Sequence, residues 1–243
     1  MIRLDRDGPL AIVHLDRPER RNALTPAMLA DLRVAIGQAD DAGALVLLGE
    51  GTAFCAGFDL NLCRESPGGE VMRALLEGLA QCVGALRCAG PPVVVGVQGA
   101  AIAGGCALLA GADYVITHDE ARLGYPVLRL GISPAVNAPA FRLAVGDGHA
   151  REKLLAPILF DGREAKRIGL AHESLADASG VRPRAIELAR TLAGKPPEAL
   201  RATKRWLNEI SPAEPLAALR VSLALAGGEE ERRMLPAAWS RGT

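Results

Sequence analysis

The chain has 243 residues, of which 49% are hydrophobic and 23% charged, and Lys plus Arg equal Asp plus Glu at 28 each. These values are typical of a globular protein with one large α/β domain, or one domain and a small appendage. A net charge of zero offers no surface for DNA, RNA or a membrane, so no nucleic-acid or membrane partner is expected. The five cysteines include no C-x-x-C pair, which argues against a disulfide framework and against a metal site.

The sequence carries no segment that would direct it into a membrane. Residues 1–18 lack the continuous apolar region of a signal peptide, and no apolar run reaches the roughly 18 residues needed to span a bilayer. Together with the cysteine pattern, this predicts a reducing, cytoplasmic setting.

Hydrophobic spacing predicts strands that alternate with helices along most of the chain. Thr25 followed by Pro26 is typical of a helix start. Short uninterrupted apolar runs such as ALVLLG and VVVGV indicate buried parallel strands. The expected strands are residues 10–15, 44–49, 93–97 and 113–118, and the expected helices are residues 26–40, 71–88 and 104–110.

The pattern changes near residue 185, after which it is entirely helical and is interrupted by prolines and one Gly-Gly pair. Alternating strands and helices favour an α/β fold with parallel strands. We therefore expect residues 1–190 to form the core and residues 191–243 to form a C-terminal helical segment.

Two turns that contain glycine are candidates for chemistry, GEGTAFCAGFDL and QGAAIAGGCALL. Neither matches a dinucleotide-binding or P-loop pattern. Gly104 and Gly105 lie at an expected helix N-terminus, where backbone amides lack intrahelical partners. A second free amide from the FCAG turn would complete an oxyanion hole for a carbonyl that gains negative charge. The alternative is that these glycines only permit a tight turn and close packing.

Several motifs, in order, resemble those of the enoyl-CoA hydratase/isomerase (crotonase) superfamily. They are RPERRNAL, AFCAGFDL, QGAAIAGGCALLAGADYVI, LGYPVLRLGISPAV and ALRATKRWLN. The resemblance covers roughly residues 1–210. It implies a ClpP/crotonase-like β-β-α superhelix whose C-terminal helical segment builds trimers or dimers of trimers. It also implies that the core binds acyl-CoA thioesters as substrate or ligand, with no permanently bound cofactor.

The resemblance also assigns roles to individual positions. The two oxyanion amides would be those of Ala56 and Gly104. Lys204 would meet the CoA phosphates of a neighbouring subunit, or would be a solvated helix lysine. The remaining positions would flank the CoA: Arg21, Ala23 and Leu24 at the adenine and ribose end, and Ala53, Gly57, Phe58, Asp59 and Leu60 along the pantetheine, with a structural role as the alternative for Asp59.

The chain departs from the family where the catalytic acids are expected. Hydratases carry two glutamates, and the matching positions here are Ala107 and Val127. Related enzymes place an acid after LGI, where this chain has Ala135. A positioned acid or base contributes about 10²–10⁴-fold to a rate, and neither alanine nor valine transfers protons. Ordinary hydration is therefore doubtful.

Other side chains near these positions are candidates to replace the missing acids. Glu65 or Tyr125 would replace the lost acids, or Arg64 would hold an acyl carboxylate, although exposed loop charges and a packing tyrosine are the alternatives. Arg129, Ser133 and Asn137 would form a polar pocket without a base. Three hypotheses remain: an enzyme that stabilises a thioester enolate, a non-catalytic protein that binds long or medium acyl-CoA, and an oligomeric subunit with a vestigial pocket.

Overall fold

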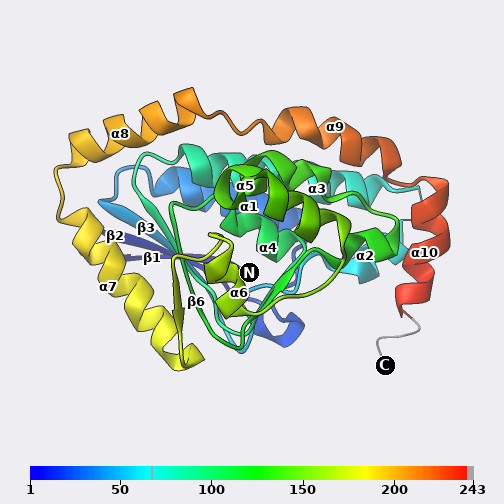
Figure 1. Ribbon diagram of the computed structural model, residues 1–243, viewed down its shortest axis with the longest axis horizontal. Helices are drawn as coiled ribbons and strands as arrows, with labels where there is room; N and C mark the ends of the chain where they lie inside the picture. The colour runs from blue at the N-terminus through cyan, green and yellow to red at the C-terminus, as the bar shows by residue number, and fades with distance from the viewer. Residues whose placement is uncertain (67, 240–243) are drawn as a thin grey trace.

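The computed structural model, described here over residues 1–66 and 68–239, is built around a six-stranded sheet in the order β1-β2-β3-β4-β6-β8 (Figure 1). Only β1 and β2 are antiparallel, and the other neighbours are parallel. A second sheet pairs β5 with β7 in parallel. The strands are β1 (Ile2–Asp7), β2 (Leu10–Leu15), β3 (Ala44–Gly49), β4 (Val93–Gly96), β5 (Ala100–Ile102), β6 (Tyr114–His118), β7 (Arg122–Gly124) and β8 (Glu173–Leu175).

Helices surround the sheet and extend beyond it. The α-helices are α1 (Pro26–Gln38), α2 (Leu60–Arg64), α3 (Glu70–Cys88), α4 (Gly104–Leu109), α5 (Ala138–Leu155), α6 (Gly162–Arg167), α7 (Val181–Ala193), α8 (Pro197–Ile210), α9 (Pro215–Leu225) and α10 (Glu229–Trp239). The 3₁₀ turns are η1 (Pro18–Arg20), η2 (Pro126–Leu130), η3 (Pro134–Asn137) and η4 (Ala178–Gly180). The predicted α/β class with parallel strands is confirmed.

Both faces of the central sheet are buried, as the uninterrupted apolar strands predicted. On β3, Val46 and Leu48 belong to a core shared with α7, whereas Leu45 and Leu47 belong to the larger core shared with α1, α3 and α4. Successive side chains point to opposite faces of a strand, so one apolar run serves two layers. The sheet therefore lies between α7 and a helical layer, and that helical layer contributes to the candidate site.

The expected strands and helices in the core are present, with ends that differ by one or two residues. Thr25 caps α1 by accepting a hydrogen bond from the Met28 amide at 3.1 Å. Strand β1 was not predicted, because its charged residues interrupt the apolar pattern. It is an edge strand and is only partly buried. Strands β5 and β7, which have three residues each, were also not predicted.

The C-terminal helices follow the core along its length. Figure 1 shows α8 and α9 along one long edge and α10 at the end where the chain terminates. The predicted boundary between residues 190 and 191 falls inside α7, and the division into two units stays a prediction. No described helix is long and apolar enough to cross a membrane.

Candidate active site

An apolar cavity of about 160 Å³ lies where α2, α3, α4, η2 and η3 meet. Both glycine-bearing turns contribute to its wall, together with both of the positions where hydratases carry glutamates. The lining residues are Ala56, Phe58, Leu60, Leu76, Leu79, Ile102, Ala103, Gly104, Ala107, Tyr125, Pro126, Val127, Leu130, Ile132, Ser133, Pro134, Val136 and Asn137. The two motifs selected from the sequence are therefore brought together at one cavity.

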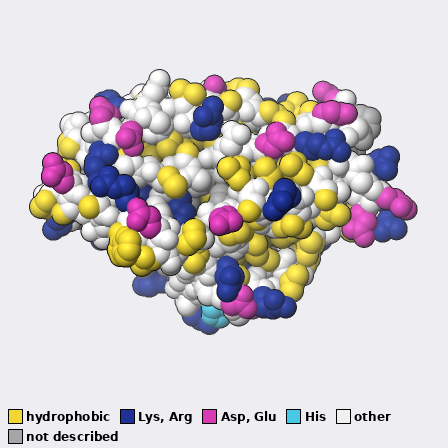
Figure 2. Space-filling model, turned by 90° about the horizontal axis from the view of Figure 1, so that it is seen from above, with side chains coloured by type: hydrophobic (Ala, Val, Ile, Leu, Met, Phe, Trp, Pro, Cys, Tyr) yellow, Lys and Arg dark blue, Asp and Glu magenta, His cyan; other side chains and the backbone are white. Residues whose placement is uncertain are grey.

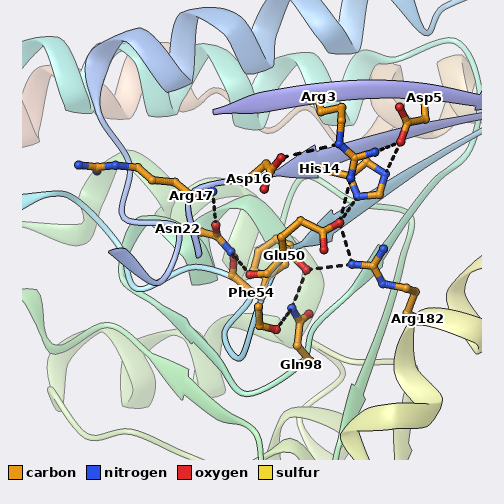
Figure 3. A network of polar contacts seen from close by, with 12 residues as sticks. Arg3, Asp5, His14, Asp16, Arg17, Asn22, Glu50, Phe54, Gln98 and Arg182 are labelled. Carbon is orange, nitrogen blue, oxygen red and sulfur yellow. Dashed lines mark hydrogen bonds and ion pairs between the residues drawn. The ribbon is translucent and has the colours of Figure 1, made fainter. Parts of the chain in front are cut away.

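The turn that follows β3 is held by the side chain of Asn22, which the sequence analysis did not select. Its Nδ2 donates to the carbonyls of Glu50, Ala53 and Phe54 at 2.8, 2.9 and 3.1 Å. Its Oδ1 accepts from the Arg17 amide at 2.8 Å. Figure 3 shows Asn22 on one side of this turn and Gln98 on the other. Asn22 is fully buried, so the turn is fixed from inside the protein.

The hydrogen bonds within the turns correct one of the two predicted oxyanion donors. The Ala56 amide donates to the Arg21 carbonyl at 2.9 Å, so it is not a free donor. The pairing of Leu24 with Phe58 uses the Gly57 carbonyl and the Asp59 amide and leaves the Phe58 amide unpaired among the described residues. Phe58, two residues after Ala56, is therefore the donor that the turn presents.

Gly104 has a second unpaired amide, at the helix N-terminus that the sequence predicted, and its role as an oxyanion donor stays a prediction. It is the first residue of α4, and no described residue accepts a hydrogen bond from its amide. A Cβ atom at this position would lie 3.0 Å from the Phe58 ring, so glycine lets the two turns pack closely without a shift of that ring. The preceding residue, Ala103, has φ 49° and ψ −110°, a conformation that favours glycine.

The cavity contains no proton-transfer group at the positions where the sequence resemblance placed the catalytic acids. Ala107 and Val127 line it, whereas Ala135 does not. No Asp, Glu, His, Lys or Arg is among the described residues that line it. Arg64 and Glu65, the loop charges considered from the sequence, are exposed and lie outside the lining, as does Arg129.

The polar side chains of the cavity are Tyr125, Ser133 and Asn137. Tyr125 is 2% exposed and accepts a hydrogen bond from Asn137 Nδ2 at 2.5 Å. Burial raises the pKa of Tyr125 well above its usual value, and burial also raises the pKa of the neighbouring Cys106 thiol to about 12. Both groups are neutral near pH 7, so they act as hydrogen-bonding groups and not as bases.

The other residues expected to flank the CoA fall into two groups. Phe58 and Leu60 line the cavity together with Ala56 and Gly104. Arg21 is exposed and has φ 50°, and Ala23 is half-buried beside it. The remaining positions, Leu24, Ala53, Gly57 and Asp59, belong to the packing around the turn.

Asp59 has the environment of a structural residue. It caps α2 through the Asn61 amide at 3.3 Å and forms an ion pair with Arg17 at 2.8 Å. Its side chain is 8% exposed. The ion pair joins the RPERRNAL segment to the turn that bears Phe58, next to the contacts of Asn22.

Lys204 is bound within its own chain. Its ammonium group lies 2.6 Å from Asp113 and donates to the carbonyls of Pro91 and Leu86. The side chain is 11% exposed, so the solvated-lysine interpretation is wrong. None of these partners lines the cavity, and the predicted contact with CoA phosphates of a neighbouring subunit stays a prediction.

The described residues contain no cluster of His, Cys, Asp and Glu that could hold a metal ion. The cysteines Cys55, Cys63, Cys82 and Cys106 are buried and unpaired, and Cys88 is exposed.

Comparison with known proteins identifies the family. Residues 5–223 match the model of the enoyl-CoA hydratase/isomerase family. A hydroxycinnamoyl-CoA hydratase-lyase of Pseudomonas fluorescens is 33% identical over 211 residues, which are 84% of this chain and 76% of that protein. The crystal structure of an enoyl-CoA hydratase/isomerase from Xanthobacter autotrophicus Py2 has a TM-score of 0.88 and 28% identity over 99% of this chain and 93% of that one.

A second solved structure, an enoyl-CoA hydratase/isomerase from Mycobacterium paratuberculosis, has a TM-score of 0.86 and 26% identity, with 97% of each chain covered. The chain therefore belongs to the enoyl-CoA hydratase/isomerase family and has the crotonase fold. The resemblance drawn from the sequence motifs is confirmed, and the family's action on CoA thioesters defines the chemistry to be tested.

Proposed function

We propose that the protein binds acyl-CoA thioesters in the apolar cavity, with the thioester oxygen accepting hydrogen bonds from the Phe58 and Gly104 amides. The observation that carries this proposal is that two residues from different turns, each with a backbone amide that has no partner among the described residues, line the same cavity. Such donors stabilise an oxygen that gains negative charge when a thioester becomes an enolate. The apolar remainder of the wall suits an acyl chain.

The reaction that this site supports best needs an enolate but little acid–base catalysis from the protein. Hydration requires a base for the water, and no described residue that lines the cavity supplies one. Decarboxylation or cleavage of a C–C bond also passes through a stabilised enolate. These reactions need less base catalysis from the protein than hydration does. One relative is named a hydratase-lyase, so cleavage should be assayed beside hydration.

The first experiment is a calorimetric titration with butyryl-CoA. We expect the native protein to bind it and to hydrate crotonyl-CoA slowly or not at all. Gly104→Pro removes the amide hydrogen and should weaken binding by about tenfold, the value of one hydrogen bond to a buried group. Gly104→Ala keeps the amide while adding a methyl group against Phe58, and serves as the control for crowding. No heat and no thermal shift with butyryl-CoA would contradict the proposal.

A non-catalytic acyl-CoA-binding protein is the second candidate, favoured by the alanine and valine at the two glutamate positions, 107 and 127. It predicts the same binding but no turnover of enoyl, 3-hydroxyacyl or β-carboxyacyl thioesters. Product analysis after long incubation with each class separates the two functions, because a single product identifies an enzyme.

The proposed assembly is a homotrimer or a dimer of trimers, built through the C-terminal helices. Three large apolar side chains of α8, Trp206, Leu207 and Ile210, are 60%, 55% and 55% exposed. Seen from the side that carries α8 and α9, hydrophobic side chains are interspersed with charged ones (Figure 2). An exposed apolar helix face of this kind is typical of an interface between subunits.

A further inference from the structure

The 3₁₀ turn η3 lies between the apolar cavity and a second hollow of about 330 Å³. Ser133 and Pro134 line both spaces. Val136 and Asn137 line the cavity, whereas Ala135 lines the second hollow. The rest of the hollow is formed by α5 and by one residue of η2. One short turn is therefore the wall that the two spaces share.

Apolar side chains of η2 and α5 contribute to the second hollow. They include Leu128, Leu154 and Leu155, and Leu155 is 66% exposed, so the hollow opens to solvent. Its charged residues include Arg142 and Asp147, which form an ion pair at 2.8 Å with side chains that are 68% and 60% exposed. An aliphatic chain that reached the hollow would bury further apolar surface against the leucines.

Ser222 of α9 holds the shared wall in place. Its hydroxyl group accepts a hydrogen bond from the Val136 amide at 3.1 Å and donates to the Ser133 carbonyl at 3.0 Å, so it bonds both ends of the first turn of η3. Ser222 is 1% exposed, and α9 is itself held by Arg73, which donates to the Ala226 carbonyl at 2.9 Å. The position of η3 therefore depends on a side chain that lies 86 residues further along the chain than Val136.

The volume of the cavity limits the acyl chain that it can hold while η3 stays in place. The cavity measures about 160 Å³. An apolar protein cavity of roughly 150 Å³ holds one benzene molecule, so an acyl group of about six carbon atoms fills a space of this size. Protein interiors are close-packed, so further methylene groups would have to displace η3 or stay outside. The intact wall therefore keeps the end of a longer chain out of the second hollow.

We propose that η3 sets the acyl chain length that the protein accepts, and that Ser222 is the positioning residue that keeps this wall closed. Acyl-CoA thioesters of up to about six carbon atoms are then the preferred ligands, in place of the long or medium chains considered from the sequence. Release of η3 joins the cavity to the second hollow and admits longer chains. The proposal rests on the proposed function, because the thioester must bind at Phe58 and Gly104 for its acyl group to enter the cavity.

The test measures affinity against chain length, by calorimetric titration of the native protein with butyryl-CoA, hexanoyl-CoA and decanoyl-CoA. One buried methylene group raises an affinity about fourfold, so hexanoyl-CoA should bind about 15-fold more tightly than butyryl-CoA. Decanoyl-CoA should bind no more tightly than hexanoyl-CoA, because η3 leaves no room for its last carbon atoms. Without such a wall, the affinity would continue to rise at each methylene group.

Ser222→Ala removes both hydrogen bonds to η3 and should open the wall. Decanoyl-CoA should then bind at least about tenfold more tightly than it binds to the native protein, while the affinity for butyryl-CoA changes by less than about twofold. A general structural defect would weaken the binding of both thioesters alike. The matched control is Ser174→Ala, which removes a hydroxyl group bonded to Asp119, lines neither space and should keep the native length dependence.

A double variant locates the end of the longer chain. Leu155→Glu, added to Ser222→Ala, places a charge in the second hollow and should remove the gain for decanoyl-CoA, because the chain would desolvate that charge. Butyryl-CoA does not reach the hollow, so its affinity should stay the same. A gain that persists in the double variant would contradict the role of the second hollow.

The titrations separate this inference from the proposed function. An affinity that rises through decanoyl-CoA in the native protein overturns the inference and leaves the proposed function standing. An unchanged length dependence in Ser222→Ala overturns the role of Ser222. Absence of binding for all three thioesters overturns both proposals. If Ser222→Ala does not fold, Ser222→Cys, a side chain of similar size that forms weaker hydrogen bonds, is tested in the same way.

Discussion

Ala103 adopts a backbone conformation at the start of α4 that a side chain disfavours. Its φ of 49° with ψ of −110° costs about 1–3 kcal/mol for a residue with a Cβ atom. We predict that Ala103→Gly raises the free energy of unfolding by about 1 kcal/mol, because the relief exceeds the added chain entropy of glycine. Urea denaturation measures this change. Ala101→Gly, in β5, is the control and should lower stability, and an equal loss at both positions would contradict the prediction.

Ala107 lines the cavity at the position where the sequence resemblance placed a hydratase glutamate. We predict that Ala107→Glu introduces weak hydration of crotonyl-CoA, followed by the loss of its conjugated-thioester absorbance. A gain of about 10²-fold over the native protein corresponds to the lower range for one positioned acid or base. Burial will raise the pKa of the introduced carboxyl group and limit the gain.

The matched control is Ala107→Gln, which has nearly the same shape but does not transfer protons. An inert Gln variant beside an active Glu variant shows that the cavity binds the thioester productively and that only the proton-transfer group is missing. Turnover by the native protein would instead reveal a base that the described lining lacks, and Tyr125→Phe would then be the first variant to assay.

Single residues also show how far the sequence could predict the site. The free amide of Gly104 could be predicted, because its place at a helix N-terminus is a local property of the sequence. The sequence did not show that the Ala56 amide is occupied and the Phe58 amide is not, because the Ala56 amide binds the Arg21 carbonyl, 35 positions away in the chain. Asn137 was placed in a polar pocket from its position beside LGISPAV, but its buried hydrogen bond to the Tyr125 hydroxyl depends on how two segments pack together.

At the scale of elements, the turn after β3 is held by the side chain of Asn22. We predict that Asn22→Ala lowers the free energy of unfolding by about 3 kcal/mol, because two buried carbonyls and one part-buried carbonyl lose this donor. Affinity for butyryl-CoA should fall with it, since the turn carries Phe58. Gln98→Ala is the comparison: it removes one donor from the carbonyls of Gly49 and Gly51, and it should cost about 1 kcal/mol because Arg182 still donates to the Gly49 carbonyl.

Strands β1, β2 and β3 share a polar cluster that makes the fold sensitive to acid. His14 is 4% exposed, with ring nitrogens 3.2 Å from Asp5 and 2.7 Å from Glu50. Figure 3 shows Arg3 and Arg182 beside it. Burial and the charge of Arg3 hold the pKa of His14 below its ordinary value of 6.5, although Glu50 opposes the shift.

The folded protein therefore binds this proton less readily than the unfolded chain does. The free energy of unfolding should fall as the pH drops below about 6.5, where the unfolded chain takes up the proton first. We predict a flatter dependence between pH 7 and pH 5 in His14→Gln, measured by urea denaturation at each pH. His149→Gln, on the exposed side of α5, is the control; a native slope in His14→Gln would contradict the prediction.

The repeating elements were also the part of the fold that the sequence predicted best. Apolar runs such as Ala44–Gly49 identified strands buried on both faces, and Thr25 marked the start of a helix. Strand β1 could not be identified in this way, since it has no uninterrupted apolar run: only Ile2 and Leu4 pack against the core, and the strand is held by pairing with β2. The 3₁₀ turns η2 and η3 lack the periodicity of longer elements.

For the whole molecule, the exposed apolar face of α8 makes self-association the property to measure first. We predict by light scattering a particle of three or six times the chain mass of 25.4 kDa. Trp206→Glu should shift the particle toward smaller species, because a charge would be buried at the interface. Val34→Glu is a control on α1, with a side chain that is 52% exposed, and should leave the mass unchanged. A monomeric native protein would contradict the proposed trimer.

The hydrogen bonds from Ser222 to the backbone of η3 have an evolutionary consequence. They make one wall of the cavity depend on α9, whereas the amides of Phe58 and Gly104 are held by turns in the first half of the chain. Substitutions in α9 can therefore reshape what the cavity accepts while the carbonyl-binding turns stay intact. Descendants of such a chain could diverge in substrate range through their last helices, with the chemical centre inherited unchanged.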